Sequence, residues 1–122
     1  MNIIYLLRKC ASLIYVKQGK YDKEMKIQDL DANELDRAAS MLKAIAHPTR
    51  IAILSLLEDN RFTVSEIHKN LNIEQSTTSH HLGILKDKGV LVSQREGKNT
   101  YYSLKYESIQ NIINCVSKCA RT

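Results

Sequence analysis

Residues 72–74 separate two stretches of helical pattern, and this very short connection constrains the fold more than any other feature of the sequence. Before it, Thr63 and Glu66 have the residue types and the spacing of a capping box, in which each side chain bonds the backbone N–H of the other residue. A short helix is therefore expected over residues 65–71, and a second helix over residues 75–88. The sequence predicts two helices joined by a tight turn.

Two further helices are expected upstream, because apolar residues recur there at spacings of three and four. The first starts at Asp31, has Asn33 as its N-cap and ends at His47. Its apolar residues are Leu35, Ala38, Ala39, Leu42, Ile45 and Ala46. Pro48 explains its end, since a proline disfavours helical geometry in the preceding residue and suits the first turn of a new helix. The second helix covers residues 49–57 and partly buries Ile51, Leu54, Leu56 and Leu57.

Downstream, the pattern changes to that of a β-hairpin. Gly89 ends the second helix of the tight pair, residues 90–95 and 100–104 are rich in β-forming residues, and residues 96–99 form the turn between them. A final helix is expected over residues 107–120. This order is typical of a winged helix-turn-helix, so the fold class expected is mostly α with a small β-hairpin wing.

The composition fits one domain of ordinary size. Of the 122 residues, 43% are apolar and 25% charged, which is typical of a soluble globular protein rather than a membrane one. We expect residues 25–122 to form the domain and residues 1–24 to be a helical extension; whether Met1 or Met25 is the start stays open. Three cysteines, an odd number without a secretory signal, indicate reduced thiols and a cytoplasmic protein.

The formal net charge of +5 suggests a polyanionic partner. Residues 1–20 alone contribute four of these charges, through Arg8, Lys9, Lys17 and Lys20. The rest of the chain is nearly neutral, so the charge supports nucleic-acid binding only weakly and a motif has to carry that argument.

The helix expected over residues 75–88 has two different faces when it is drawn at about 100° per residue. The inward face carries Thr78, His81, Leu82 and Leu85, and the outward face carries Ser76, Ser79, His80 and Gly83. The outward face is slim and polar, so it can enter a major groove and bond base edges and phosphates. Gln75, at the start of the helix, can read adenine in a bidentate manner. An ordinary solvated surface is the alternative.

The hairpin adds two basic residues, because Arg95 and Lys98 flank its tip. They are placed to contact phosphates or the minor groove; a merely solvated hairpin is the alternative. Arg61 and Phe62 are expected to form a further short strand.

Three runs of sequence, over residues 46–54, 76–86 and 97–104, give the chain a specific resemblance. They read AHPTRIAIL, STTSHHLGILK and GKNTYYSL, and they resemble the ArsR/SmtB family of bacterial metal- and thiol-responsive repressors. The resemblance implies a winged helix-turn-helix homodimer that binds double-stranded operator DNA until an inducer releases it. It further implies that dimers form through the first and last helices, for which the stripes Ile3, Leu7, Cys10, Ile14 and Ile109, Ile112, Val116 are available.

The metal ligands of the family are largely missing from this chain. Where the family has cysteines in its short third helix, this chain has Thr63 and Ser65. Where the last helix of the family presents Asp, His and Glu ligands, this chain has Tyr106, Ser108, Cys119 and Thr122. One ligand of four remains, so a zinc, cobalt or nickel site is not expected.

Cys10, Cys115 and Cys119 are the remaining candidates for an inducer site. Three converging thiolates would suit arsenite, antimonite or Cu(I). The same thiols would serve as a redox switch, and simple packing as small apolar residues is the third alternative. The sequence leaves all three open.

No catalytic motif is present, so neither an enzyme nor a small-molecule substrate is expected. The competing functional class is a dimeric winged-helix module that binds protein rather than DNA. That class predicts apolar residues on the exposed face of residues 75–88, where Ser79 and His80 stand instead. A repressor with a non-thiol inducer also remains open.

Overall fold

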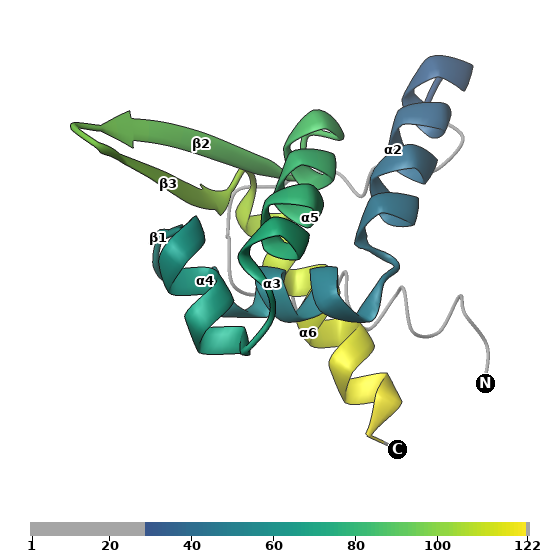
Figure 1. Ribbon diagram of the computed structural model, residues 1–122. Helices are drawn as coiled ribbons and strands as arrows, with labels where there is room; N and C mark the ends of the chain where they lie inside the picture. Colours follow the sequence, from purple (N-terminus) through teal and green to yellow (C-terminus); the bar gives the residue numbers. More distant parts are fainter. Residues whose placement is uncertain (1–28, 122) are drawn as a thin grey trace.

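The computed structural model describes residues 29–121 and contains five helices and three strands over that range. The elements are α2 (Ala32–Ile45), α3 (Pro48–Leu56), β1 (Phe62–Thr63), α4 (Val64–Leu71), α5 (Gln75–Asp87), β2 (Leu91–Glu96), β3 (Asn99–Leu104) and α6 (Glu107–Ala120). The helices form one body, from which the hairpin of β2 and β3 projects (Figure 1). This is the expected winged helix-turn-helix. The extension expected over residues 1–24 lies outside the described residues.

The capping signals explain where the helices begin. Thr63 and Glu66 form the expected capping box, and α4 starts one residue earlier than expected, at Val64. For α2 the expectation of Asn33 as the N-cap was wrong, because Asp31 is the N-cap and forms a capping box with Glu34. This helix also ends at Ile45 rather than at His47, since His47 has extended geometry and caps α3.

The turn between α4 and α5 depends on one backbone conformation. Asn72 has a φ of 53°, in the left-handed region that asparagine tolerates better than most residues. Its backbone N–H bonds the carbonyl groups of His68 and Lys69, which ends α4 within a single residue. The chain therefore reverses quickly enough for α4 and α5 to pack against each other.

The three strands form one antiparallel sheet in the order β1-β3-β2. The hairpin turn contains only Gly97 and Lys98, two residues fewer than expected, because Glu96 and Asn99 still pair. Gly97 has a φ of +61°, a conformation that side chains disfavour, which explains glycine at this position. On the other edge of β3, Phe62 pairs with Tyr102.

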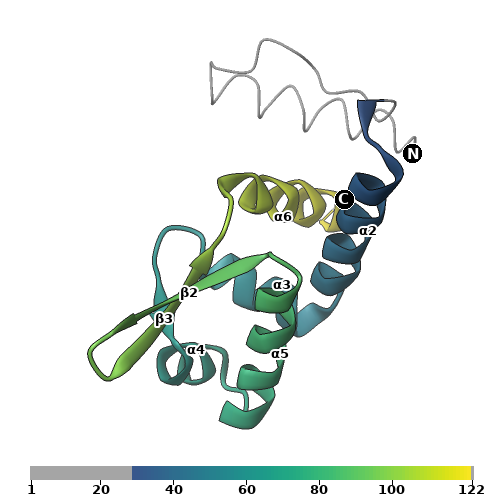
Figure 2. The same cartoon turned by 90° about the horizontal axis from the view of Figure 1, so that it is seen from above.

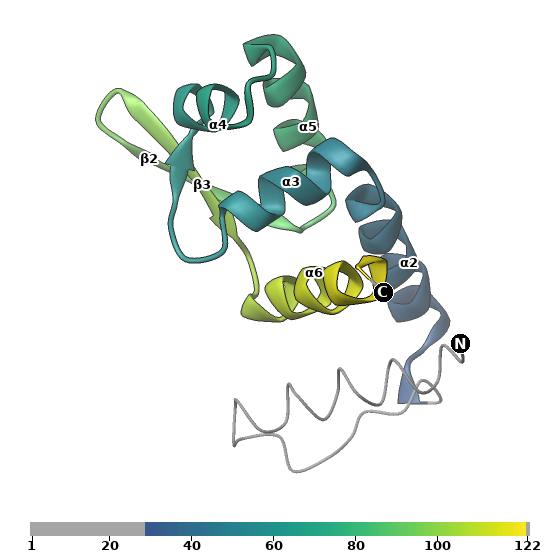
Figure 3. The same cartoon turned by 90° about the horizontal axis from the view of Figure 1, so that it is seen from below.

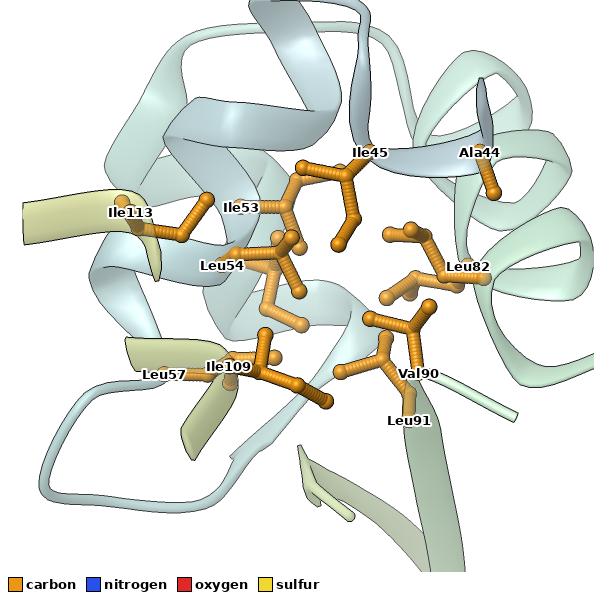
Figure 4. Packing of buried hydrophobic residues seen from close by; sticks show 12 residues of the cluster. Ala44, Ile45, Ile53, Leu54, Leu57, Leu82, Val90, Leu91, Ile109 and Ile113 are labelled. Carbon is orange, nitrogen blue, oxygen red and sulfur yellow. The ribbon is translucent and has the colours of Figure 1, made fainter. Parts of the chain in front are cut away.

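The core draws on every helix and on β2, and most of it is seen in Figure 4. Its buried apolar residues are Ala44, Ile45, Ile53, Leu54, Leu57, Ile67, Leu82, Leu85, Val90, Leu91, Ile109 and Ile113. The packing of α6 corrects one expectation: Ile109 is buried in the core of its own chain, so it is not available to a dimer interface. Of the apolar residues expected along α2, Ile45 is buried, whereas both leucines, Leu35 and Leu42, are exposed.

Seen from two further directions, α3 and α6 lie side by side (Figures 2 and 3). Among the described residues, no helix has the length and apolar content needed to cross a lipid bilayer.

Candidate nucleic-acid interface

The two faces of α5 are divided as the sequence predicts. Thr78, His81, Leu82 and Leu85 are buried, whereas Gln75, Ser76, Ser79, His80 and Gly83 are exposed. A Cβ atom added at Gly83 would meet no atom within 4 Å, so packing within the described chain does not require a glycine there. The exposed face therefore combines short polar side chains with a position that has no side chain at all.

The N-terminus of α5 leaves backbone donors available. Glu74 is the N-cap, but its side chain makes no capping hydrogen bond in the described part of the chain. The first helical bond runs from the backbone N–H of Thr78 to the carbonyl of Glu74, at 3.0 Å. The backbone N–H groups before Thr78 precede that bond, and at a helix N-terminus such groups favour an anion such as phosphate.

His81 fixes the buried side of α5 to α3. Its Nδ1 accepts a hydrogen bond of 3.1 Å from Nε of Arg50, and its ring centroid lies 4.7 Å from that of His47. The same Arg50 donates from its other end to the backbone carbonyl of Ala44 at the end of α2, at 3.0 Å. The expectation that His81 lies on the inward face of this helix is confirmed.

Burial lowers the pKa of His81, and the nearby His47, Arg50 and His80 lower it further. A guanidinium can only donate hydrogen bonds, so the Nδ1 atom that accepts from Arg50 carries no proton. The neutral form of His81 is therefore the form that this contact requires.

The wing carries both of the basic residues singled out from the sequence. Arg95 on β2 and Lys98 in the turn are exposed, and Nε of Arg95 bonds the carbonyl of Gly97 at 3.4 Å. They lie on a different element from the polar face of α5, and the wing that holds them extends away from the helices (Figure 1). The structure thus gathers Gln75, Ser76, Ser79 and His80 on one helix and places Arg95 and Lys98 on a second, separate element.

Arg61 anchors the wing to the rest of the protein. Its Nη2 bonds Oε2 of Glu96 at 2.8 Å in a two-pronged ion pair, and its Cζ lies 4.4 Å from the centre of the Tyr101 ring. The hydrogen bond and charge of Arg61 lower the pKa of Glu96 and keep this carboxylate ionised. One residue just before β1 therefore contacts both strands of the hairpin.

The cysteines of the final helix are half-buried. Cys115 and Cys119 lie one helical turn apart on α6. Cys115 takes part in a disulfide, so the expectation that all three thiols are reduced was wrong for this cysteine. Cys10 lies outside the described residues. Within residues 29–121, His, Cys, Asp and Glu side chains form no cluster of three or more that could hold a metal ion.

Sequence reasoning did not find the contacts of Arg50, Arg61 and Glu96. Arg50 and His81 are 31 residues apart, and Arg61 and Glu96 are 35 apart, so no local sequence pattern predicts that they meet. The sequence did mark Arg50 as a residue of interest, because it lies in one of the three runs that carry the family resemblance. Arg61 lies outside all three runs, so the sequence did not mark it.

Comparison with known proteins identifies the family. Residues 47–93 match the model described as "Bacterial regulatory protein, arsR family". The transcriptional repressor SdpR of Bacillus subtilis strain 168 is 41% identical over 75 residues, which span 62% of this chain and 83% of SdpR.

Solved structures agree with these matches. The transcriptional repressor PagR of Bacillus anthracis superimposes with a TM-score of 0.66 at 33% identity, over 70% of this chain and 99% of PagR. The homodimeric winged helix-turn-helix DNA-binding domain of Mb0332 from Mycobacterium bovis gives a TM-score of 0.67 at 28% identity, over 83% of this chain and 91% of that domain. These relatives are regulators rather than enzymes, as the sequence led us to expect. The chain belongs to the arsR family of bacterial regulatory proteins.

Proposed function

We propose that this chain is a cytoplasmic transcriptional repressor that binds double-stranded operator DNA as a homodimer. The observation that carries the proposal is the exposed face of α5. There Gln75, Ser76, Ser79 and His80 present polar side chains that make no hydrogen bond to the described part of the chain. The match to a family of regulatory proteins supports the same function, and so does the similarity to the repressor SdpR.

In this mechanism α5 enters the major groove. The amide of Gln75 has the geometry to read adenine, and Ser79 and His80 bond base edges or phosphates. The backbone N–H groups at the start of α5 contact a phosphate, and Arg95 and Lys98 of the wing contact phosphates or the minor groove. The contact of Arg50 with His81 holds the helix from behind while its front face reads DNA.

A homodimer supplies two such helices to an operator with twofold symmetry, because one helix reads only a few base pairs. Ile112 and Val116 on α6 support this assembly, since their side chains are 37% and 53% exposed on a helix whose other side is in the core. Mb0332, a relative in structure, is described as homodimeric. The N-terminal stripe that includes Ile3 and Cys10 would complete the interface.

Fluorescence anisotropy with labelled DNA from the chain's own promoter tests the proposal at fixed salt. Substituting both Ser79→Ala and His80→Ala should weaken binding by about 1–3 kcal/mol for each good bond to a base that the substitutions remove. The matched control is Asn33→Ala with Lys118→Ala, two exposed residues outside α5 and the wing, and it should bind like the unaltered chain.

An unchanged affinity in the folded α5 variant would contradict the assignment of α5 as the reading helix. Binding with no preference for promoter DNA over a scrambled duplex would favour the protein-interaction module instead. Circular dichroism of each variant shows whether it has folded.

We infer further that the signal which releases the DNA is a thiol-reactive agent or a soft metal(loid). The disulfide at Cys115 supports an oxidisable thiol on α6. An oxidant such as an organic polysulfide would take two electrons from two thiols, so that an S–S bond forms and two protons leave. In the reduced state, Cys10, Cys115 and Cys119 together would suit arsenite, antimonite or Cu(I).

The same anisotropy assay distinguishes these signals. The reduced complex is titrated separately with arsenite, Cu(I), zinc and an organic polysulfide. Release by one agent that no longer occurs in Cys115→Ser would identify the class of inducer. If none of the four agents changes the affinity for DNA, the cysteines are packing residues and the repressor has a non-thiol inducer.

A further inference from the structure

Two histidines and one arginine meet where the end of α2, the start of α3 and the middle of α5 come together (Figures 2 and 3). The ring centroids of His47 and His81 lie 4.7 Å apart, and Nε of Arg50 donates to Nδ1 of His81 at 3.1 Å. These three residues are called the basic corner below. Each of them carries a positive charge or can take one up.

Both histidines act as hydrogen-bond acceptors in the basic corner. Nδ1 of His47 accepts from the backbone N–H of Thr49 at 3.2 Å, and so caps the first turn of α3, which carries Arg50. Nδ1 of His81 accepts from Nε of Arg50, whose Nη1 reaches the carbonyl of Ala44. One histidine therefore holds the turn that carries Arg50, and the other receives its guanidinium. A ring nitrogen accepts a hydrogen bond only while it carries no proton.

Within the described part of the chain, no carboxylate balances the charge of the basic corner. The charges that act on His81 are those of His47, Arg50 and His80, and all three oppose a proton on its ring. The elements α2, α4 and β2 also pack against α5, but their titratable side chains are not among these charges. Those side chains, all exposed except for the half-buried histidine, belong to Glu34, Asp36, Arg37, Lys43, Glu66, His68, Lys69, Arg95 and Glu96.

His81 itself is 7% exposed, so a proton on its ring would lie in a largely buried place beside a guanidinium. A buried charge without a partner of opposite sign is strongly destabilising. The arrangement seen in the structure is therefore specific for the neutral ring.

We propose that a proton on His81 releases α5 from the basic corner and thereby lowers the affinity for operator DNA. The proton removes the acceptor that Arg50 uses and places a second positive charge against the guanidinium. The face of α5 that reads DNA then loses its support from behind. Acid is in this way an effector that needs neither a thiol nor a metal. The effect on DNA rests on the proposed function, whereas the proton-sensitive contact does not.

The pH range of the effect follows from the surroundings of His81. Burial, and then the neighbouring His47, Arg50 and His80, hold its pKa below the ordinary value of 6.5 while α5 stays in place. When α5 moves away, the ring gains solvent and loses Arg50, so the pKa returns towards that value. Protons therefore favour the released arrangement as the pH falls below about 6.5, and have no such effect above it.

His80 provides a contrast of opposite sign. It is exposed on the face of α5 that is proposed to meet DNA. A proton on this ring adds a positive charge where phosphates lie, which strengthens binding. Two adjacent histidines therefore have opposite effects on operator affinity in acid, and removal of His81 alone should reveal the favourable one.

Fluorescence anisotropy of the full chain with promoter DNA, at about pH 7.5 and about pH 5.5 and at fixed salt, tests the proposal. His81→Asn places an amide oxygen where Nδ1 stands and takes up no proton. Relative to this variant, the unaltered chain should lose about tenfold in affinity between the two pH values. His68→Asn removes a histidine of α4 outside the basic corner, and it should lose as much as the unaltered chain.

A second measurement needs no substitution. NMR follows the ring of His81 in the unaltered chain during a pH titration, with and without promoter DNA. Because coupling between two ligands is reciprocal, bound DNA should move the titration midpoint of His81 to lower pH. Circular dichroism at about pH 5.5 should show a chain that is folded when it releases DNA. If release coincides with unfolding, the proposal is wrong.

Two further results would overturn the proposal: an equal change of affinity in His81→Asn and the unaltered chain, and a midpoint of His81 that DNA does not lower. A chain that binds no promoter DNA at about pH 7.5 refutes the proposed function instead.

The contact itself is then tested through hydrogen exchange without DNA. Protection of the α5 amides, corrected for the intrinsic exchange rate, should fall in acid more than protection of the α6 amides. His81→Asn should remove this difference between the two helices. If it does not, the proton-sensitive contact is refuted as well, so the two failures are distinguishable.

Discussion

Nε of Arg50 donates a hydrogen bond to Nδ1 of His81 across 3.1 Å, which joins α3 to the buried side of the helix proposed to read DNA. Because Arg50 also bonds the carbonyl of Ala44, one guanidinium near the start of α3 contacts the end of α2 and the middle of α5. A proton on Nδ1 of His81 would remove the acceptor that this arrangement uses. The position of α5 is therefore linked to the protonation of a residue on its hidden side.

The first prediction is that His81 makes the folded chain less stable in acid. The pKa of His81 is lowered in the folded chain by burial and by nearby His47, Arg50 and His80, whereas in the unfolded chain it returns to about 6.5. As the pH falls below about 6.5, the unfolded chain takes up a proton at this site and the folded chain does not, so the free energy of unfolding falls. Above that pH the site makes no pH-dependent contribution.

Urea denaturation at about pH 7.5 and about pH 5.5 measures this effect. The loss of stability between the two values should be smaller in His81→Gln than in the unaltered chain. His80→Gln, which removes only the smallest of the contributions that lower this pKa, should keep most of the original loss. If His81→Gln loses as much stability as the unaltered chain, His81 does not couple folding to pH.

The second prediction concerns the anchor of the wing. Arg61→Gln removes the cation that bonds Glu96 and lies on Tyr101, so the pKa of Glu96 should rise towards its ordinary value. Both side chains of the pair are nearly half exposed, so global stability should hardly change. Operator affinity should fall because the wing is less well positioned.

Carboxyl NMR titration of Glu96 and anisotropy with promoter DNA check both parts. Arg37→Gln, an exposed arginine on α2, is the control of equal charge. A rise in the pKa of Glu96 with full operator affinity would show that the anchor does not position the wing for DNA.

The third prediction concerns Gly83. An exposed glycine inside a helix costs about 0.5–1 kcal/mol relative to alanine, and a Cβ at this position would meet nothing within 4 Å. Gly83→Ala should therefore raise the free energy of unfolding by that amount. Gly83→Leu should fold equally well but weaken operator binding, because the larger side chain keeps α5 from lying close to the bases. A Leu variant with unchanged operator affinity would contradict the close approach.

The fourth prediction concerns assembly. Ile112→Glu combined with Val116→Glu places charges on the exposed apolar side of α6, where they should oppose a dimer interface without disturbing the core. Analytical ultracentrifugation should show a dimer for the unaltered chain and a monomer for the variant. Asn111→Glu with Lys118→Glu, on other sides of α6, serves as the comparison. A dimeric Ile112 and Val116 variant would move the interface elsewhere.

Much of the fold was predictable because its signals are local. The capping box of Thr63 and Glu66 and the two faces of α5 depend on residues within a few positions of one another. The cap of α2 was misassigned although Asp31 and Glu34 have the same box spacing, since Asn33 is also a cap-forming residue. For the hairpin, the boundary residues Glu96 and Asn99 read as turn formers yet pair across it.

The contacts behind the candidate interface were not predictable from spacing. Arg50 meets His81 and Arg61 meets Glu96 only after the chain has folded, and each pair is separated by more than 30 residues. The burial of Ile109 likewise depends on how α6 lies against α3, which a helical period does not specify.

The two-residue strand β1 restricts the motion of only one part of the wing. Tyr101 and Tyr102 of β3 are paired on one side with β1 and on the other with β2, whereas Asn99 and Thr100 are paired with β2 alone. Amide hydrogens of Tyr101 and Tyr102, in the middle of β3, should therefore exchange with solvent much more slowly than those near the tip of the hairpin. The basic tip can adjust to the local width of a DNA groove while its base stays fixed to the protein, so a single wing can follow operators whose shape differs from one sequence to another.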